Sequence, residues 1–338
     1  QWGVNHSIRD NRSKYPFTIS LNLQDTSDGL EAMLTGLDNF DKSDVLGVIG
    51  PMQSSYAFYA KKWANQTNTP VISPLASASY LTSPGEKDFF FRATMSDGAR
   101  ARNLVEWVTA KGLQNNPYLI HEWSPPIVGE DAPEIYGASQ ATAAKRYLKS
   151  AETIRFTRGN EETMLEAVEK VENDGRAILI FGYTSNIKII IKALQDKGVE
   201  NDIFLMGVVT KSLEEGDFAF PQKLHVVTPD VSEARSLTDS AALRRDFEDD
   251  NPTLEYDIST YYAYDSVTIL LDAITAARQN SCANRVDGEM VAEALRKTPN
   301  KRRKMLNSGF MTDTQEVFFR YDGLKMFNGK FRHVGIGE

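Results

Sequence analysis

Two stretches of this chain combine residue types that suit the binding of a small anion. Residues 45–55 and residues 70–79 each end an apolar run in a proline-containing turn and then supply serine side chains. Strand ends that offer hydroxyls and backbone N–H groups beside a helix start are favourable positions for an anion. The serines at these two ends are Ser54 and Ser55 in the first stretch and Ser73, Ser77 and Ser79 in the second.

No catalytic or metal-binding pattern accompanies these serines. The sequence has no G-x-S-x-G, G-x-x-x-x-G-K-[ST] or H-E-x-x-H motif, so the common hydrolase, phosphate-loop and zinc-protease patterns are not met. Acidic groups at 214–217 and 248–250 lack calcium-loop spacing. The histidines are scattered: His6, His121, His225 and His333. We therefore expect no enzyme activity, cofactor or metal. The remote alternative is an α/β enzyme with an unrecognised site.

Composition indicates an ordinary globular chain with two cores. The 338 residues are 41% hydrophobic, enough for two medium domains. A formal net charge of −8 disfavours a nucleic-acid partner. No run reaches the roughly 18 to 20 apolar residues of a membrane helix, and the single cysteine, Cys282, excludes an internal disulfide. The chain opens at Gln1 without Met, as we expect of a mature or trimmed chain.

Strand and helix patterns alternate along most of the chain. We expect strands at 17–23, 45–49, 71–72, 89–91, 118–121, 152–156, 177–181, 204–207 and 224–228. We expect helices at 30–40, 54–66, 97–108, 139–148, 161–172 and 187–194. Such alternation with short connections predicts parallel sheets covered by helices on both faces. Because a turn-rich segment near residue 116 separates two series, the fold class is α/β with two doubly wound, Rossmann-like lobes.

The pattern changes after Pro229. Helices are expected at 243–249, 259–278 and 288–297, followed by strand-like segments at 317–321 and 330–334. Since these helices have no strands between them, we expect them to complete the first lobe rather than to build a third one.

Several motifs in this order resemble one family. They are Gly50-Pro51 with Ser54-Ser55, 70–74 with Ala76-Ser77, Phe91-Arg92, Gly182-Tyr183, and Tyr256 with 261–265. Over nearly the whole chain, the sequence resembles the type I periplasmic binding proteins, the leucine/isoleucine/valine-binding family of ABC-transporter receptors. The resemblance implies two lobes, a ligand cleft and three hinge crossovers near 115–117, 228–231 and 321–327. Lobe 1 would comprise 1–116 plus 230–324, and lobe 2 would comprise 117–229 plus 325–338.

The resemblance also assigns roles to the serine-bearing strand ends. It implies that Ser54, Ala76 and Ser77 hold a ligand carboxylate, which suits the charge-assisted donors near a helix start. Two structural alternatives stay open. Ser54 would only cap its helix in one, and Ser77 would only bond its own backbone in the other.

Aromatic residues are the expected contribution of the second lobe. The resemblance points to Tyr136 and Tyr183, and to Tyr256 at the return to the first lobe. Tyr136 follows a segment that is atypical of the family, so Trp123 is its rival. Ordinary core packing is the alternative for each of these rings.

Two positions depart from the family pattern. Where relatives carry an acid for the ligand ammonium, this chain has Val208-Val209-Thr210. Thr210 is retained as a candidate, and Asp230 or Asp257 would replace the acid. The family's first strand has no counterpart in the sequence, so lobe 1 must be completed in another way or the chain is a fragment.

The sequence therefore predicts an extracytoplasmic solute-binding protein, periplasmic or extracellular. It would capture a small carboxylate-bearing ligand, amino acid-like or an aromatic acid, by cleft closure for uptake through the membrane permease of an ABC transporter. The alternative is the ligand-binding ectodomain of a membrane sensor with a fused signalling module.

Overall fold

The chain folds into two compact units. The computed structural model describes residues 1–83, 85–123, 136–207, 213–214, 223–229, 238–253, 258–281, 285–297, 309–311, 316–318, 321–327 and 330–334. Unit 1 comprises Gln1–Ser96 and Val231–Phe319, and unit 2 comprises Asp97–Asp230 and Arg320–Glu338. The chain thus passes between the units three times. Within these described residues, no helix is long and apolar enough to span a membrane.

The first boundary between the units differs from the expected one. The family resemblance implies that helix α4 (Asp97–Ala110) lies in the first lobe, but in the structure it belongs to unit 2. Its buried Trp107 and Val108 share an apolar core with Phe204, so burial rather than sequence order decides its place. The other two passages lie at 230/231 and 319/320.

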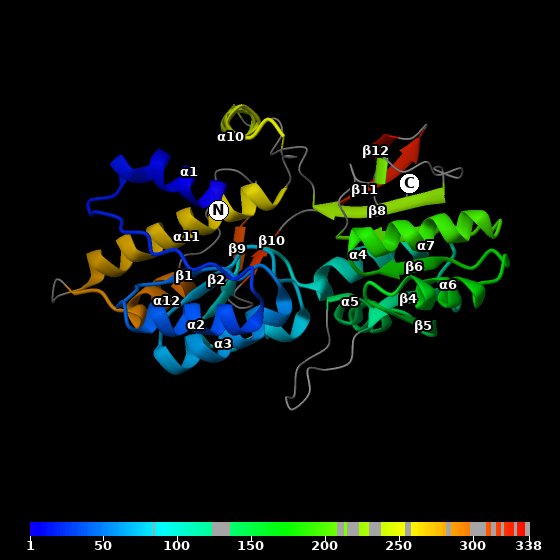
Figure 1. Ribbon diagram of the computed structural model, residues 1–338, viewed down its shortest axis with the longest axis horizontal. Coiled ribbons are helices and arrows are strands. Elements are labelled where there is room, and N and C mark those ends of the chain that lie inside the picture. Colours follow the sequence, from blue (N-terminus) through cyan, green and yellow to red (C-terminus); the bar gives the residue numbers. More distant parts are fainter. Residues whose placement is uncertain are drawn as a thin grey trace. The chain divides into compact units, whose positions relative to one another are not determined.

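Unit 1 contains a sheet of short strands with the order β1-β2-β3-β10-β9 (Figure 1). The strands are β1 (Val48–Ile49), β2 (Val71–Ser73), β3 (Phe90–Arg92), β10 (Glu316–Phe318) and β9 (Gly309–Met311). All pair in parallel except β9 with β10. Helices α2 (Leu30–Asp41) and α3 (Ser54–Thr67) pack together on the core of this unit.

The expected strand at 17–23 is not a strand. This segment has no sheet partner, and its Leu21 and Leu23 side chains are 44% and 53% exposed. Among the described strands, β1 is the sheet edge and pairs only with β2. Alternating residues become a strand only when a neighbour accepts their backbone hydrogen bonds, so the sequence pattern alone was misleading here.

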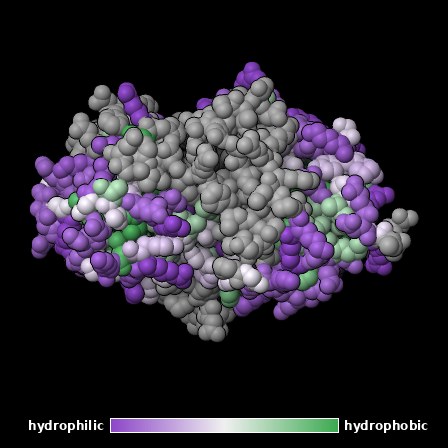
Figure 2. Space-filling view, turned by 180° about the vertical axis from the view of Figure 1, so that it is seen from behind, coloured by the Kyte–Doolittle hydropathy of each residue, from purple (hydrophilic) through white to green (hydrophobic). Residues whose placement is uncertain are grey.

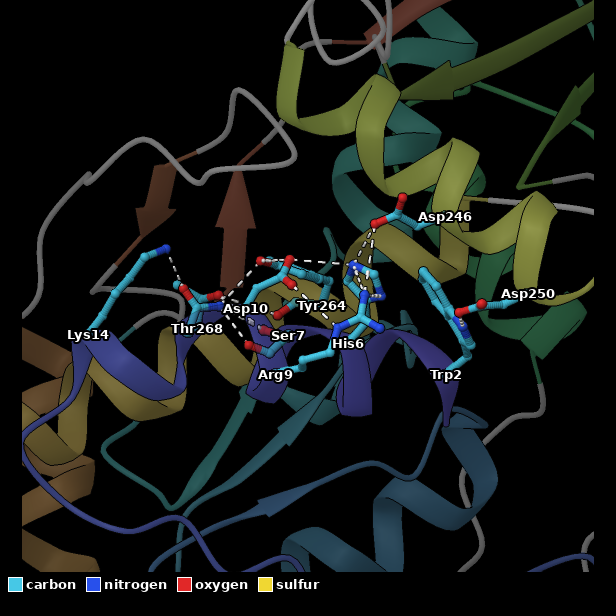
Figure 3. A network of polar contacts seen from close by, with 11 residues as sticks. Trp2, His6, Ser7, Arg9, Asp10, Lys14, Asp246, Asp250, Tyr264 and Thr268 are labelled. Atoms are coloured by element: carbon cyan, nitrogen blue, oxygen red, sulfur yellow. Dashed lines mark hydrogen bonds and ion pairs between the residues drawn. The ribbon is translucent and has the colours of Figure 1, made fainter.

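The described part of unit 1 also contains four further α-helices: α1 (Trp2–Asn11), α10 (Thr238–Asp250), α11 (Ile258–Asn280) and α12 (Gly288–Lys297). A polar network joins the first three of them (Figure 3). His6 of α1 lies 3.2 Å from Asp246 of α10, and Tyr264 of α11 donates to Asp10 at 3.1 Å. The N-terminal helix is therefore tied to two helices that are more than 200 residues away in the sequence.

Unit 2 contains a longer, mainly parallel sheet with the order β12-β11-β8-β7-β6-β4-β5. The strands are β4 (Tyr118–Trp123), β5 (Glu152–Thr157), β6 (Ile178–Phe181), β7 (Ile203–Met206), β8 (Leu224–Pro229), β11 (Tyr321–Phe327) and β12 (Lys330–Val334). Strand β11 pairs antiparallel with both β8 and β12, and the other described pairs of this sheet are parallel.

Both faces of this sheet are buried. Helices α6 (Glu161–Glu169) and α7 (Thr184–Asp196) share one core with Ile120 and Ile178. Helices α4 and α5 (Tyr136–Lys145) share the other with Leu119 and Leu179. Successive residues of one strand thus enter opposite cores. This arrangement makes unit 2 a doubly wound α/β unit.

The exposed side chains of the described residues are mainly polar. On the face seen in Figure 2, the described residues are mainly hydrophilic, and hydrophobic ones form small separate patches. Such scattered apolar surface needs no special explanation.

Candidate ligand-binding site

The carboxyl ends of β4 and β6 form the switch point of the unit 2 sheet. Strand β4 pairs with β5 on one side and with β6 on the other, and β6 continues to β7. The connections that leave β4 and β6 therefore run in opposite directions. In open α/β sheets, ligands bind outside the carboxyl ends of such strands.

Two of the sequence-predicted aromatic residues meet at this point. Tyr136 is the first residue of α5, and Tyr183 immediately precedes α7. Their rings lie 5.3 Å apart at an angle of 47°, a tilted pair. The rival residue, Trp123, lies at the end of β4 with 38% of its surface exposed, and no ring contact with either tyrosine is recorded for it.

Tyr136 is held by its hydroxyl. It donates a hydrogen bond of 3.2 Å to the carbonyl oxygen of Gly207, just after β7. Burial raises the pKa of Tyr136 to about 12, so the phenol is neutral at physiological pH and keeps its proton for this bond. The ring therefore has a fixed position between the ends of β4 and β7.

A buried carboxylate, Glu122, lies beside the Tyr183 backbone and was not identified from the sequence. It is fully buried at the end of β4, and its Oε2 accepts from the Tyr183 N–H at 3.3 Å. Burial raises its pKa, while that N–H and Arg158 act in the opposite direction. Gly137 and Gly182 make room for it, since a Cβ on Gly137 would lie 2.7 Å from the Glu122 Cβ.

Arg158, which directly follows β5, was also not identified from the sequence. Its Nε lies 3.6 Å from Glu122 Oε1, and its guanidinium carbon lies 4.0 Å from the centre of the Tyr183 ring. We call the set Glu122, Trp123, Tyr136, Arg158 and Tyr183 the aromatic edge. Nothing in the local sequence distinguishes Arg158 from other surface arginines, because its partners come from β4 and the β6–α7 junction.

Unit 1 presents a different edge, which consists of hydroxyls and backbone groups. Ser54 Oγ accepts from the Ala78 N–H at 3.2 Å, and the Tyr80 hydroxyl donates to the Ser54 carbonyl at 3.3 Å. These bonds place the segment after β2 against the first turn of α3. Ser54 is the first residue of α3 and makes no capping bond, so the helix-cap alternative is wrong. We call residues 50–55 and 73–80 the hydroxyl edge.

Ser77 has the most unusual position in the hydroxyl edge. Its side chain is 1% exposed, and its hydroxyl has no hydrogen-bond partner among the described residues. The alternative that it bonds its own backbone is therefore wrong. Beside it, the first N–H groups of α3 have no intrahelical acceptor and no side-chain cap. Buried hydroxyls without a partner are rare and call for an explanation such as a ligand.

Two further features fix the segment that carries Ser77. The Ser73 hydroxyl donates to the Pro51 carbonyl at 2.6 Å and accepts from the Ala76 N–H at 3.1 Å. The fully buried Arg92 donates to the carbonyl of Ala78 at 3.1 Å and also to the Thr82 hydroxyl. The carbonyls of this segment are thus occupied, and a positive charge lies beneath it.

Four candidates cannot be placed. Thr210, Asp230, Tyr256 and Asp257 lie outside the described residues. Ser55 is described and lies half-buried in the first turn of α3. Within the part of the chain that is described, no group of three or more histidine, cysteine or acidic residues could hold a metal ion.

Fold and family agree on the class of protein. The model of the family described as "Receptor family ligand binding region" matches residues 6–325, so the chain belongs to this family. Its fold is that of the type I periplasmic binding proteins. A leucine-binding protein from Thermotoga maritima aligns with a TM-score of 0.76 and 18% identity, over 98% of this chain and 91% of that one.

One further solved structure and one sequence relative are also similar to this chain. A branched-chain amino acid binding protein from Streptococcus pneumoniae, solved with isoleucine, aligns with a TM-score of 0.72 and 17% identity, over 98% and 92% of the two chains. In sequence, the chain is 25% identical to glutamate receptor 2.9 of Arabidopsis thaliana over 284 residues. That alignment covers 79% of this chain but only 29% of the relative.

Proposed function

We propose that this protein is an extracytoplasmic solute-binding protein that captures a small carboxylate-bearing ligand, amino acid-like or an aromatic acid. Its two units would close on the ligand about the three passages of the chain. A ligand that binds the closed form more tightly than the open form shifts the equilibrium towards closure. The protein would deliver the ligand to the membrane permease of an ABC transporter.

The observation that carries the proposal is the buried, unpartnered hydroxyl of Ser77 beside the start of α3. A carboxylate suits this position because it accepts several hydrogen bonds and gains from the helix dipole. The proteins of similar fold include a leucine-binding protein and a binding protein solved with isoleucine. Both ligands carry a carboxylate.

A second function rests on the sequence relatives. The chain spans about three tenths of the length of glutamate receptor 2.9 and glutamate receptor 2.8 of Arabidopsis thaliana. The same ligand-binding region could therefore act as the ectodomain of a membrane sensor, in which closure signals to an attached module. Both functions need binding without turnover and a periplasmic or extracellular location.

A thermal-shift screen against amino acids, aromatic acids and small amides tests the proposal. A ligand at about 100 times its dissociation constant should raise the stability of the native state by about 2.7 kcal/mol. After incubation with pure protein, the ligand should be recovered unaltered. A chemically changed ligand, or no shift with any of these compounds, would contradict the proposal.

A further inference from the structure

In the described part of unit 2, Arg158 and Arg176 each stack on a tyrosine ring. They differ in whether their N–H groups donate hydrogen bonds to the protein. Arg176 lies 3.7 Å from the centre of the Tyr118 ring. Its N–H groups are used: Nε donates to Asp174 at 2.6 Å, and one terminal nitrogen donates to Glu152 at 2.9 Å and to the Asn116 carbonyl at 3.3 Å. Arg176 thus has the contacts of a structural clamp at the amino ends of β4 and β6.

Arg158 stacks in the same way at the carboxyl ends of the strands but forms no hydrogen bond in the described part of the chain. Its one ionic partner is Glu122, at 3.6 Å from Nε, which is beyond hydrogen-bond range. A guanidinium carries five N–H donors in a rigid fork. Those of Arg158 are accessible, because its side chain is 49% exposed.

The orientation of Arg158 is nevertheless fixed. The Tyr183 ring lies 4.0 Å from its guanidinium carbon on one side. Glu122 attracts it from beneath, and Glu122 is itself anchored by the Tyr183 N–H. A guanidinium that is already positioned loses less conformational entropy when it binds a planar anion through two parallel hydrogen bonds.

Glu122 itself cannot serve as the partner of a ligand ammonium. It is fully buried, and the backbone at Gly137 and Gly182 approaches it so closely that a Cβ on either would lie within 3.1 Å of a Glu122 atom. The charge that the aromatic edge offers to a ligand is therefore the positive charge of Arg158. This charge repels an ammonium and attracts an acidic group.

We infer that Arg158 binds a second acidic group of the ligand, so that the preferred ligands are dicarboxylates. This second group would form a bidentate pair with the Arg158 guanidinium. Glu122 is a positioning residue that acts on Arg158. This inference rests on the proposed function and adds the class of ligand to it.

Two matched pairs of acids test the inference by isothermal titration calorimetry on the full chain. L-glutamate is compared with L-norvaline, and glutarate with pentanoate. In each pair, a distal methyl replaces a distal carboxylate. We expect the diacid to bind at least tenfold more tightly in at least one pair. Arg158→Gln should abolish this preference, and Arg158→Lys should retain part of it because the charge stays while the fork is lost.

The control is Arg155→Gln. It removes an exposed arginine of β5, three residues before Arg158, and should leave the preference for the diacid unchanged. The melting temperature of Arg155→Gln should match that of the wild-type protein. That of Arg158→Gln should fall, because the variant loses the stacking on Tyr183 and the charge opposite the buried Glu122. A destabilised Arg158→Gln that keeps the wild-type preference would assign Arg158 a structural role and overturn the inference.

The remaining outcomes separate the two proposals. Equal binding of diacid and monoacid overturns the inference and leaves the proposed function intact. The same conclusion follows if only ligands without a second acid bind and Arg158→Gln binds them normally. If none of the four acids binds, the inference is wrong. If the thermal-shift screen is also negative, the proposed function falls with it.

Discussion

The two sheet edges differ in how they are built, although both end parallel strands and begin helices. The hydroxyl edge of unit 1 consists of neutral donors whose backbone is fixed by Ser73, Ser54 and Arg92. The aromatic edge of unit 2 consists of side chains that fix one another, with Tyr136 against Tyr183 and Arg158 on Tyr183. The first depends on backbone geometry and the second on side-chain identity.

This difference has a consequence for specificity. Backbone N–H groups and serine hydroxyls recognise the carboxylate that every member of a ligand class shares. Rings and a charged fork recognise what distinguishes one member from another. We therefore expect substitutions in the hydroxyl edge to weaken all ligands, and substitutions in the aromatic edge to change their ranking.

The largest expected effect is on the free energy of unfolding and comes from Arg92→Met, which removes the side chain that holds the hydroxyl edge in place. Arg92 is fully buried and donates to the Ala78 carbonyl and the Thr82 hydroxyl, so its removal leaves buried acceptors without partners. The free energy of unfolding should fall by about 3–5 kcal/mol in urea titrations. Arg102→Met, on the exposed side of α4, should change it by about 0.5 kcal/mol or less. Equal effects of the two variants would contradict this account of the edge.

Ser54 and Ser77 provide an intermediate test within the same edge. Ser77→Ala should cost about 1.5–3 kcal/mol of ligand affinity and leave stability unchanged, because its hydroxyl has no partner in the described part of the protein. The Ser54→Ala variant should lose a similar amount of ligand affinity. It should also lose about 1–3 kcal/mol of stability, because the Ala78 N–H would be unpaired.

The measurements for this pair are calorimetric titration with the ligand found in the screen, and urea unfolding. Ser83→Ala, at an exposed position of unit 1, is the control and should alter neither quantity. If Ser77→Ala lowers stability but not affinity, the hydroxyl has a structural role that contradicts the binding site.

The smallest expected effect concerns pH and involves one histidine in each unit. Burial lowers the pKa of His6 in unit 1 and of His225 in unit 2. Around His6, Asp10 and Asp246 raise the pKa and Arg9 lowers it (Figure 3). His225 lies 2.6 Å from Asp202, which also raises the pKa but does not outweigh burial.

Because both folded-state pKa values lie below the ordinary value of 6.5, the unfolded chain binds more protons in the window just below pH 6.5. Stability should therefore be constant from pH 8 to about 7 and should fall as the pH drops through 6.5. Thermal melts across this range measure the slope. His6→Gln and His225→Gln should each flatten it, and a slope that neither variant changes would contradict the assignment.

Local patterns in the sequence determined most of the elements. Helices α3 and α7 and strands β5 and β6 lie within a few residues of their expected positions, because their periodicity and end signals are local. The family resemblance, rather than local periodicity, pointed to Tyr136 and Tyr183, which the structure places in ring contact. The prediction of a strand at 17–23 was wrong because a strand also requires a neighbouring strand as its hydrogen-bond partner, and no local pattern supplies one.

What the sequence by itself determined was therefore the α/β class and the serine-bearing strand ends, whereas the two tyrosines came from the family resemblance. Only the tertiary structure decided that α4 belongs to unit 2, that Ser77 lacks a partner, and that Glu122 and Arg158 join the aromatic edge. The physical reason is the range of the interactions. Periodicity, turns and caps involve neighbours along the chain, whereas burial, ion pairing and ring stacking join residues from separate strands.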